Sequence, residues 1–153
     1  MLETGQLAPD FALRTDAGQD FRLSAQRGRA VVLYFYPKDD TPGCTAEACA
    51  FRDQYEDFLE LGAAVVGVSS DSESSHQKFS RKHRLPFPLL ADPGGKVRKL
   101  YEVPRALLGL LPGRVTFVID AEGVIRYIFN SLSGATDHVS NSKQVLRELS
   151  VKK

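Results

Sequence analysis

The chain contains only two cysteines, Cys44 and Cys49, and they follow a pattern that is typical of a helix start. Thr41 is a favourable N-cap residue, and Pro42 suits the first helical position, where a missing N–H costs nothing. Cys44 then falls in the first turn, among free backbone N–H groups at the positive end of the helix dipole. This environment stabilises a thiolate, the nucleophilic form of cysteine. We therefore predict that Cys44 is a reactive thiol rather than a small buried hydrophobic residue.

The spacing of the two cysteines limits how they can react with each other. In an intact helix, residues five positions apart have their Cα atoms roughly 8.7 Å from each other. A disulfide rarely spans more than about 7 Å between Cα atoms. If Cys44 and Cys49 pair, we therefore expect the first turns of the helix to unwind. The reduced form would be helical, and the oxidised form would be locally unfolded, with a readily reducible disulfide.

Other uses of the cysteines fit the sequence less well. Two unrelated thiols are less expected, because cysteine pairs in reducing compartments are usually redox or metal sites. The five-residue spacing does not match the usual ligand spacing of a zinc site. The three histidines, His76, His83 and His138, lie in polar segments, where we expect each of them to be solvated. The sequence thus predicts no metal site and no cofactor.

A buried strand is expected to position the cysteine helix. Residues 30–36 form a nearly continuous apolar run rich in β-branched and aromatic residues, as in strands buried on both faces of a sheet. The helix is expected to cover residues 42–61 and to end at Gly62. Further strands are predicted at residues 63–69, 87–92, 115–120 and 124–130, with a turn at 121–123. Further helices are predicted at residues 72–83, 92–101 and 139–149.

The alternation of strands and helices predicts an α/β fold, with a central mixed β-sheet flanked by helices on both faces. Residues 9–14 and 19–23 predict an N-terminal β-hairpin extension, followed by a helical turn at residues 24–28. Residues 107–111 are unusually apolar for a connection. They either fold over the core or form an exposed patch for a partner.

Length and composition indicate an ordinary soluble protein. The 153 residues are expected to form a single domain over residues 1–153, and 42% of them are hydrophobic and 25% charged. A net charge of +1 gives no field that would favour nucleic acid or a membrane surface. No apolar run approaches the roughly 20 residues of a membrane span. The first residues lack the features of a signal peptide, which favours a cytoplasmic location, although a plastid protein without its transit peptide would look similar.

The residues around Cys44 resemble those of the peroxiredoxins. The motif Pro37-x-x-x-Thr41-x-x-Cys44 is specific to that family, and the Cys44–Cys49 spacing is similar to that of the bacterioferritin-comigratory-protein or PrxQ subgroup. The resemblance covers essentially the whole chain. Its motifs are Gly5-x-x-Ala8-Pro9-Asp10-Phe11, Asp39-Asp40-Thr41-Pro42-Gly43-Cys44-Thr45-x-Glu47 and Leu111-Pro112-Gly113-Arg114-Val115-Thr116-Phe117-Val118-Ile119-Asp120. The Leu-Pro-Gly-Arg context looks closer to the plant and cyanobacterial type.

This resemblance implies a thioredoxin-like fold and a thiol peroxidase that acts on hydrogen peroxide and organic hydroperoxides. Cys44 would match the peroxidatic cysteine and Cys49 the resolving cysteine. Peroxide would oxidise Cys44 to a sulfenic acid, which would condense with Cys49 to give an intramolecular disulfide. Thioredoxin or a similar dithiol would then reduce the disulfide. A monomer is expected, because both cysteines lie in one predicted helix.

The resemblance also implies supporting residues around the thiol. Thr41 and Arg114 would hold the peroxide and the thiolate, with Arg114 donating hydrogen bonds to the peroxide oxygens. Pro37 would shape and shield the pocket, and Glu47 would orient neighbouring polar groups. From the residues alone, Arg114 could equally be an ordinary surface arginine at the start of a strand. Thr41 could be only an N-cap.

Two other functions remain open from the sequence. The same disulfide switch could serve a peroxide sensor or a partner-regulating protein, with helix unwinding as the output and residues 107–111 as the docking surface. A slow oxidation of Cys44 would favour this reading. A protein disulfide oxidoreductase is disfavoured, because the cysteines are not in a Cys-x-x-Cys arrangement.

Overall fold

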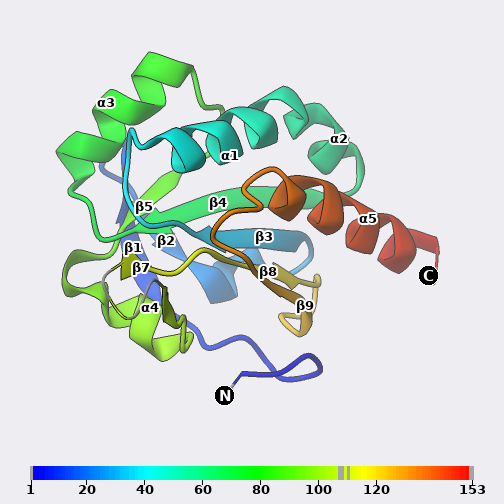
Figure 1. The fold of residues 1–153 in the computed structure, drawn as a ribbon. Helices are drawn as coiled ribbons and strands as arrows, with labels where there is room; N and C mark the ends of the chain where they lie inside the picture. The colour runs from blue at the N-terminus through cyan, green and yellow to red at the C-terminus, as the bar shows by residue number, and fades with distance from the viewer. Residues whose placement is uncertain (1, 107–108, 110, 152–153) are drawn as a thin grey trace.

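The computed structural model describes residues 2–106, 109 and 111–151 of the chain. Its centre is a mixed seven-stranded sheet with the order β2-β1-β5-β4-β3-β8-β9 (Figure 1). A small ribbon pairs β6 with β7 beside this sheet. The strands are β1 (Ala12–Thr15), β2 (Asp20–Arg22), β3 (Ala30–Phe35), β4 (Ala63–Ser69), β5 (Leu89–Ala91), β6 (Arg105–Ala106), β7 (Leu111–Pro112), β8 (Val115–Ile119) and β9 (Ile125–Asn130).

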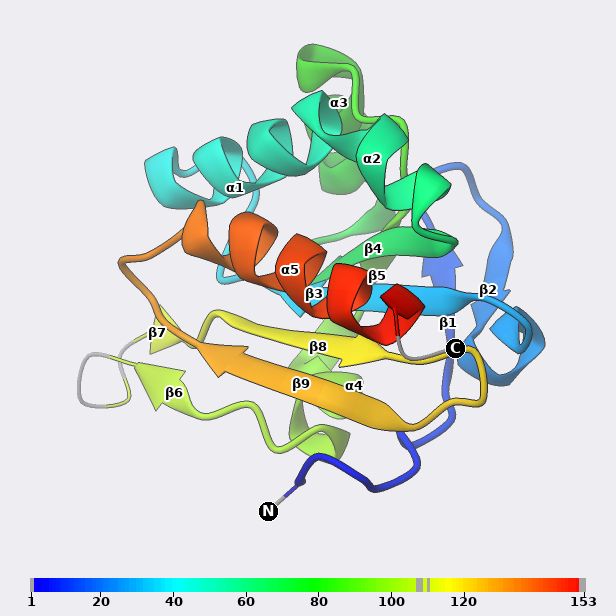
Figure 2. The same cartoon turned by 90° about the vertical axis from the view of Figure 1, so that its right-hand side faces the viewer.

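Helices cover both faces of the sheet, as the sequence predicts. Figure 2 shows α1, α2, α3 and α5 above the sheet and α4 below it. The α-helices are α1 (Pro42–Asp53), α2 (Tyr55–Glu60), α3 (Glu73–His83), α4 (Lys96–Leu100) and α5 (Asp137–Val151). The 3₁₀ turns are η1 (Leu23–Gln26) and η2 (Pro93–Gly95).

The central strand β3 leads directly to the cysteine helix. It runs parallel to β4 and antiparallel to β8, and Phe35 pairs with Val68 on one side and with Val115 on the other. Successive side chains of a strand point to opposite faces of the sheet. Accordingly, Leu33 and Phe35 pack in the core between the sheet and α4, whereas Val32 packs in the core between the sheet and the helices α1 and α5. The prediction of a strand buried on both faces is confirmed.

The helix predicted over residues 42–61 is wrong in one respect, because it breaks at Gln54. The backbone there has φ −109° and ψ 12°, which ends α1 and starts α2. The break redirects the chain so that α2 lies along β4. Phe58 of α2 still meets Phe51 of α1, with ring centroids 5.6 Å apart. Both rings are fully buried, so their packing stabilises the change of direction between α1 and α2.

The N-terminal hairpin follows its prediction. β1 and β2 are antiparallel, with Leu13 opposite Phe21, and the turn uses Gly18 at φ 76°. The prediction for residues 107–111 falls largely on residues 107, 108 and 110, which lie outside the described residues. In the part of the chain that is described, no helix combines the length and the apolar character needed to cross a membrane.

Candidate active site

Cys44 lies in the first turn of α1, where the loop that follows β3 becomes helical. Thr41 occupies the N-cap position with extended backbone angles, and its carbonyl accepts the first helical hydrogen bond from the Thr45 N–H at 2.8 Å. The side chain of Thr41 does not cap the helix, contrary to a simple N-cap role. Its hydroxyl donates instead to the Lys38 carbonyl at 2.9 Å. The free N–H groups of the first turn therefore do not donate to the Thr41 hydroxyl, and their partial positive charge remains near the thiol.

Arg114 contacts the thiol directly and is not a surface arginine. It lies just before β8, and only 3% of the residue is exposed. Its Nη2 donates to Cys44 Sγ at 3.4 Å, its Nη1 to Glu47 Oε1 at 2.6 Å and its Nε to the Leu132 carbonyl at 3.1 Å. All three nitrogens of the guanidinium are thus fixed. Cys44 is 1% exposed and Glu47 is fully buried, so these contacts form away from bulk water, where electrostatic interactions are strong.

Gly43 allows Arg114 to approach the helix this closely. A Cβ atom at position 43 would lie 2.9 Å from Arg114 Nη2, which is closer than real Cβ contacts. Its backbone is not in the left-handed region, so the reason for a glycine here is space rather than conformation. A side chain at this position would have to displace the same nitrogen that contacts Cys44.

Glu47 is a buried carboxyl group that is only half satisfied. Its Oε1 accepts from Arg114, but its Oε2 has no hydrogen-bond partner among the described residues. Burial raises the pKa of Glu47 to about 8, although the charge of Arg114 acts in the opposite direction. Burial therefore favours the protonated form of Glu47 near neutral pH. A neutral carboxyl group holds Arg114 in place by a hydrogen bond and leaves its positive charge available to Cys44.

His138 closes the far side of this site. It belongs to the first turn of α5 and is fully buried, so the prediction that it is solvated is wrong. Its Nε2 donates to the Ser131 carbonyl at 2.8 Å, which leaves Nδ1 to accept from the Thr116 hydroxyl at 2.7 Å. Burial lowers the pKa of His138 to about 4, so the ring is neutral. Its Nδ1 lies 3.7 Å from Glu47 Oε2, too far for a hydrogen bond.

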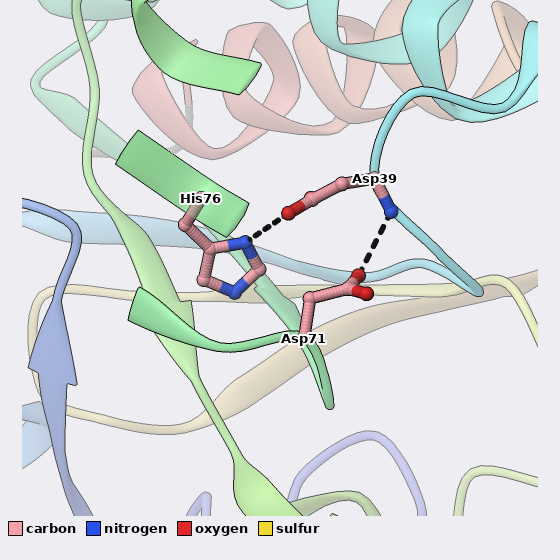
Figure 3. Close-up of side chains that lie close together, drawn as sticks. All are labelled: Asp39, Asp71 and His76. Atoms are coloured by element: carbon pink, nitrogen blue, oxygen red, sulfur yellow. Dashed lines mark hydrogen bonds and ion pairs between the residues drawn. The ribbon is translucent and has the colours of Figure 1, made fainter. Parts of the chain in front are cut away.

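His76 is also fully buried, again contrary to the prediction. Its Nδ1 donates to Asp39 Oδ2 at 2.7 Å (Figure 3). Its Nε2 donates to the Leu90 carbonyl at 2.9 Å. Burial acts to lower the pKa of His76, but the hydrogen bond and charge of Asp39 outweigh it, and the pKa is raised. Asp39 precedes α1 by three residues. The Asp39–His76 pair therefore anchors the loop that enters the cysteine helix to α3 and β5.

The cluster in Figure 3 is better described as a hydrogen-bonded anchor than as a metal centre. Potential ligand atoms of Asp39, Asp71 and His76 lie within 4.8 Å of one another. However, Asp71 Oδ2 already accepts from the Asp39 N–H at 2.8 Å and from the Ser69 hydroxyl at 2.6 Å. Both nitrogens of His76 are engaged as well. A cation would have to displace these contacts, so the geometry gives no reason to revise the expectation of a metal-free site.

The remaining residues that the sequence singles out are half-buried. Pro37 is half-buried in the loop between β3 and α1. Cys49 is a free, half-buried thiol within the same continuous helix as Cys44. The third histidine, His83, is also half-buried and lies 3.7 Å from Asp40, so it is not fully solvated either.

Sequence reasoning missed the polar residues that support the site from a distance. His76, Phe79 and His83 recur at spacings of three and four, which place them on one face of a helix, and this signal indicates partial burial. His138 precedes Val139 and Ser142 on the buried face of α5 in the same way. No local signal marks their partners, because Asp39 and Thr116 lie in other elements.

Comparison with known proteins identifies the family of this chain. Residues 4–128 match the model of the AhpC/TSA family. The chain is 50% identical over 145 residues to the chloroplastic peroxiredoxin Q of Oryza sativa subsp. japonica, covering 95% of this chain and 67% of that relative. The structure of peroxidoxin BcpB from Mycobacterium tuberculosis is similar, with a TM-score of 0.89, 38% identity, and coverage of 97% of this chain and 99% of that one.

A second solved structure, the bacterioferritin comigratory protein of Xanthomonas campestris, has a TM-score of 0.84 and 30% identity, with 97% of this chain and 99% of that chain covered. The described residues accordingly adopt the thioredoxin-like fold of the peroxiredoxins. The chain belongs to the AhpC/TSA family and, within it, to the peroxiredoxins of the Q and bacterioferritin-comigratory type.

Proposed function

We propose that this peroxidase reduces hydrogen peroxide and organic hydroperoxides by a two-cysteine cycle centred on Cys44. The contact that supports the proposal best is the hydrogen bond from Arg114 Nη2 to Cys44 Sγ at 3.4 Å, inside a buried first turn of a helix. This arrangement stabilises a thiolate through the charge and the hydrogen bond of the guanidinium, whose Nη1 and Nε are held by Glu47 and the Leu132 carbonyl. The Xanthomonas campestris relative is described by its alkyl peroxide reduction activity, which supports organic hydroperoxides as substrates.

In the first step, the Cys44 thiolate attacks one oxygen of the peroxide and breaks the O–O bond. A sulfenic acid forms at Cys44, and the leaving oxygen takes up a proton to become an alcohol or water. Arg114 stabilises the negative charge that moves from sulfur to the leaving oxygen. We assign to the Thr41 hydroxyl, which donates to the Lys38 carbonyl at 2.9 Å, the role of orienting the peroxide, and to Pro37 the role of limiting access to Cys44.

In the second step, the Cys49 thiol displaces the hydroxyl group of the sulfenic acid, and the products are a Cys44–Cys49 disulfide and water. Both cysteines lie within α1, whose helical geometry holds their Cα atoms roughly 8.7 Å apart. The first turns of α1 therefore unwind for the disulfide to form. A dithiol such as thioredoxin then reduces the bond by thiol–disulfide exchange, and the helix re-forms.

Two cysteine variants test this cycle. We expect Cys44→Ser to abolish turnover with peroxide. We expect Cys49→Ser to complete one fast oxidation, measured by stopped flow, but not to cycle with thioredoxin. Sustained thioredoxin-driven turnover by Cys49→Ser would contradict the resolving role of Cys49. An oxidation rate of Cys44 no greater than that of a free thiol would contradict peroxidase function itself.

The proposed enzyme works as a single-domain monomer, because one helix carries both cysteines and no second subunit is needed. The cycle also requires a compartment that keeps thiols reduced. The cytoplasm meets this requirement, and so does a plastid, the location given for the peroxiredoxin Q proteins of Oryza sativa and Arabidopsis thaliana. Light scattering of the reduced and oxidised protein tests the monomer.

A further inference from the structure

Arg98 is a second buried arginine near the active site, and it approaches from the opposite face of the sheet. It belongs to α4, which lies on the other side of the sheet from α1 (Figure 2). Only 7% of the residue is exposed. The carboxylate of Asp92 fixes the start of α4 by accepting from the backbone N–H groups of Val97 at 3.0 Å and Arg98 at 2.9 Å. The position of the Arg98 side chain is therefore well defined.

The guanidinium of Arg98 bridges two chain segments that lead to the catalytic residues. Its Nη2 donates to the Tyr36 carbonyl at 2.7 Å, and its Nη1 donates to the Gly113 carbonyl at 2.9 Å. Tyr36 is the residue after β3, and Gly113 is the residue before Arg114. The last pair between β3 and β8 is Phe35 with Val115, so the two bridged carbonyls lie just beyond the end of the paired strands. Arg98 joins the chain segments where they separate.

We propose that Arg98 is a positioning residue for the peroxidase reaction, whose guanidinium sets the separation between the Tyr36 segment that leads to Cys44 and the Gly113 segment that carries Arg114. The inference rests on the proposed role of Arg114. If the Gly113 carbonyl shifts, the backbone of Arg114 shifts with it. A misplacement of about 1 Å can reduce a rate by roughly 100-fold, so the separation matters for chemistry as well as for stability.

An arginine suits this position better than another cation. Its planar fork presents two parallel donors at a fixed spacing, whereas lysine presents a single nitrogen. The guanidinium also lies over the ring of Phe35, with Cζ 5.8 Å from the ring centroid, which restricts its orientation. Among the described residues, the hydrogen bonds of its guanidinium go to these two backbone carbonyls, and its Nε has no partner. These contacts therefore join the backbone segments on either side of the site.

Electrostatics offers an alternative role, which the experiment must separate from positioning. Burial lowers the pKa of Arg98, while Asp92 and then Cys44 act to raise it. Cys44 is thus near enough to interact with the charge of Arg98. A purely electrostatic role would stabilise the thiolate towards every electrophile. A positioning role slows most strongly the reaction in which Arg114 holds the peroxide as well as the thiolate, and it slows less a reaction that needs only the thiolate.

The test compares two electrophiles in the Cys49→Ser background, where Cys44 reacts once. Arg98→Lys and Arg98→Met are compared with Lys99→Met, which alters an exposed neighbour in the same helix. Stopped flow measures oxidation by hydrogen peroxide, and mass spectrometry measures alkylation of Cys44 by iodoacetamide. We expect Arg98→Met to slow oxidation by roughly tenfold or more and alkylation by less than about threefold. Arg98→Lys should lie between it and the control.

Several outcomes would overturn the inference. Equal slowing of both reactions would indicate an electrostatic role. Oxidation within about twofold of the control, in variants with a native circular dichroism spectrum, would indicate a role in stability alone. If Arg98→Met does not fold, Arg98→Lys carries the test, because it keeps the charge and most of the length. Slow oxidation of Cys49→Ser with Arg98 intact would instead count against the proposed function.

Discussion

The buried carboxyl group of Glu47 gives a prediction that runs against the usual view of an ion pair. Glu47 lies 2.6 Å from Arg114, so its removal is commonly expected to destabilise the fold. In this structure, however, burial raises the pKa of Glu47 from 4.5 to about 8. A carboxyl group whose pKa is raised in the folded state binds a proton more tightly there than in the unfolded chain. Its ionisation as the pH rises therefore lowers the free energy of unfolding.

The size of this effect follows from the two pKa values. The difference between 4.5 and about 8, at about 1.36 kcal/mol for each pKa unit, corresponds to about 5 kcal/mol when ionisation is complete. The loss begins above the unfolded value near pH 4.5, reaches about 3 kcal/mol at pH 7 and is complete above pH 8. Glu47→Gln has a similar shape to the protonated acid and does not ionise. We expect the variant to match the wild type near pH 4.5 and to be the more stable protein above pH 7.

The measurement is urea denaturation of both reduced proteins at several pH values between 4.5 and 9. The difference between the two proteins isolates Glu47, because the histidines and other titrating groups are present in both. Glu60→Gln, at an exposed position on α2, controls for the loss of a charge. A Glu47→Gln protein that is less stable than the wild type by 3–5 kcal/mol at pH 8 would refute the reasoning. It would show that the carboxylate is ionised and that its pairing with Arg114 is net favourable.

Two further predictions concern residues next to the same carboxyl group. Gly43→Ala places a Cβ 2.9 Å from Arg114 Nη2, so stopped flow should show oxidation of Cys44 slowed by roughly tenfold. Thermal unfolding should show a loss of stability of about 1–2 kcal/mol, because the displaced Arg114 overpacks a buried site and outweighs the helix preference of alanine. An unchanged rate would contradict the steric argument. The pKa of His138 falls from 6.5 to about 4 on folding, so its contribution to stability is complete above pH 6.5 and is lost as the pH falls towards 4. Denaturation at pH 4 and 7 should show a loss of about 3 kcal/mol that is absent in His138→Gln, and equal acid sensitivity of both proteins would contradict the assignment of a neutral ring.

The elements that the sequence predicts well are those encoded by local patterns. The apolar run at β3 and the Thr41–Pro42 helix start depend on neighbouring residues, and both are present. The break at Gln54 was not predicted, because it depends on where Phe58 meets Phe51 in the folded core. Local patterns set element type, whereas the packing of one element on another sets the bends within them.

The polar interior could not be read from the sequence for a different reason. His76 and Asp39 are 37 residues apart, and Arg114 and Cys44 are 70 residues apart. Neither partner carries a local sign of the other, so the polar segment around each histidine predicts exposure to solvent. The ionisation of Glu47 depends on burial and on the lack of a partner for Oε2, which are properties of the whole fold.

Glu47 also connects the stability of α1 to the proposed disulfide. It lies between Cys44 and Cys49 in the chain, so unwinding of the first turns of α1 must draw it out of its buried site. Once exposed, the carboxyl group regains an ordinary pKa and releases its proton, which favours the unwound state by about 3 kcal/mol at pH 7. The burial of Glu47, which holds Arg114 beside Cys44, therefore also lowers the free energy needed to unwind α1 before the disulfide forms. Glu47→Gln removes this contribution, so we expect the variant to form the disulfide more slowly after Cys44 is oxidised. An unchanged rate of disulfide formation at pH 7 would show that the proton released by Glu47 does not assist the unwinding of α1.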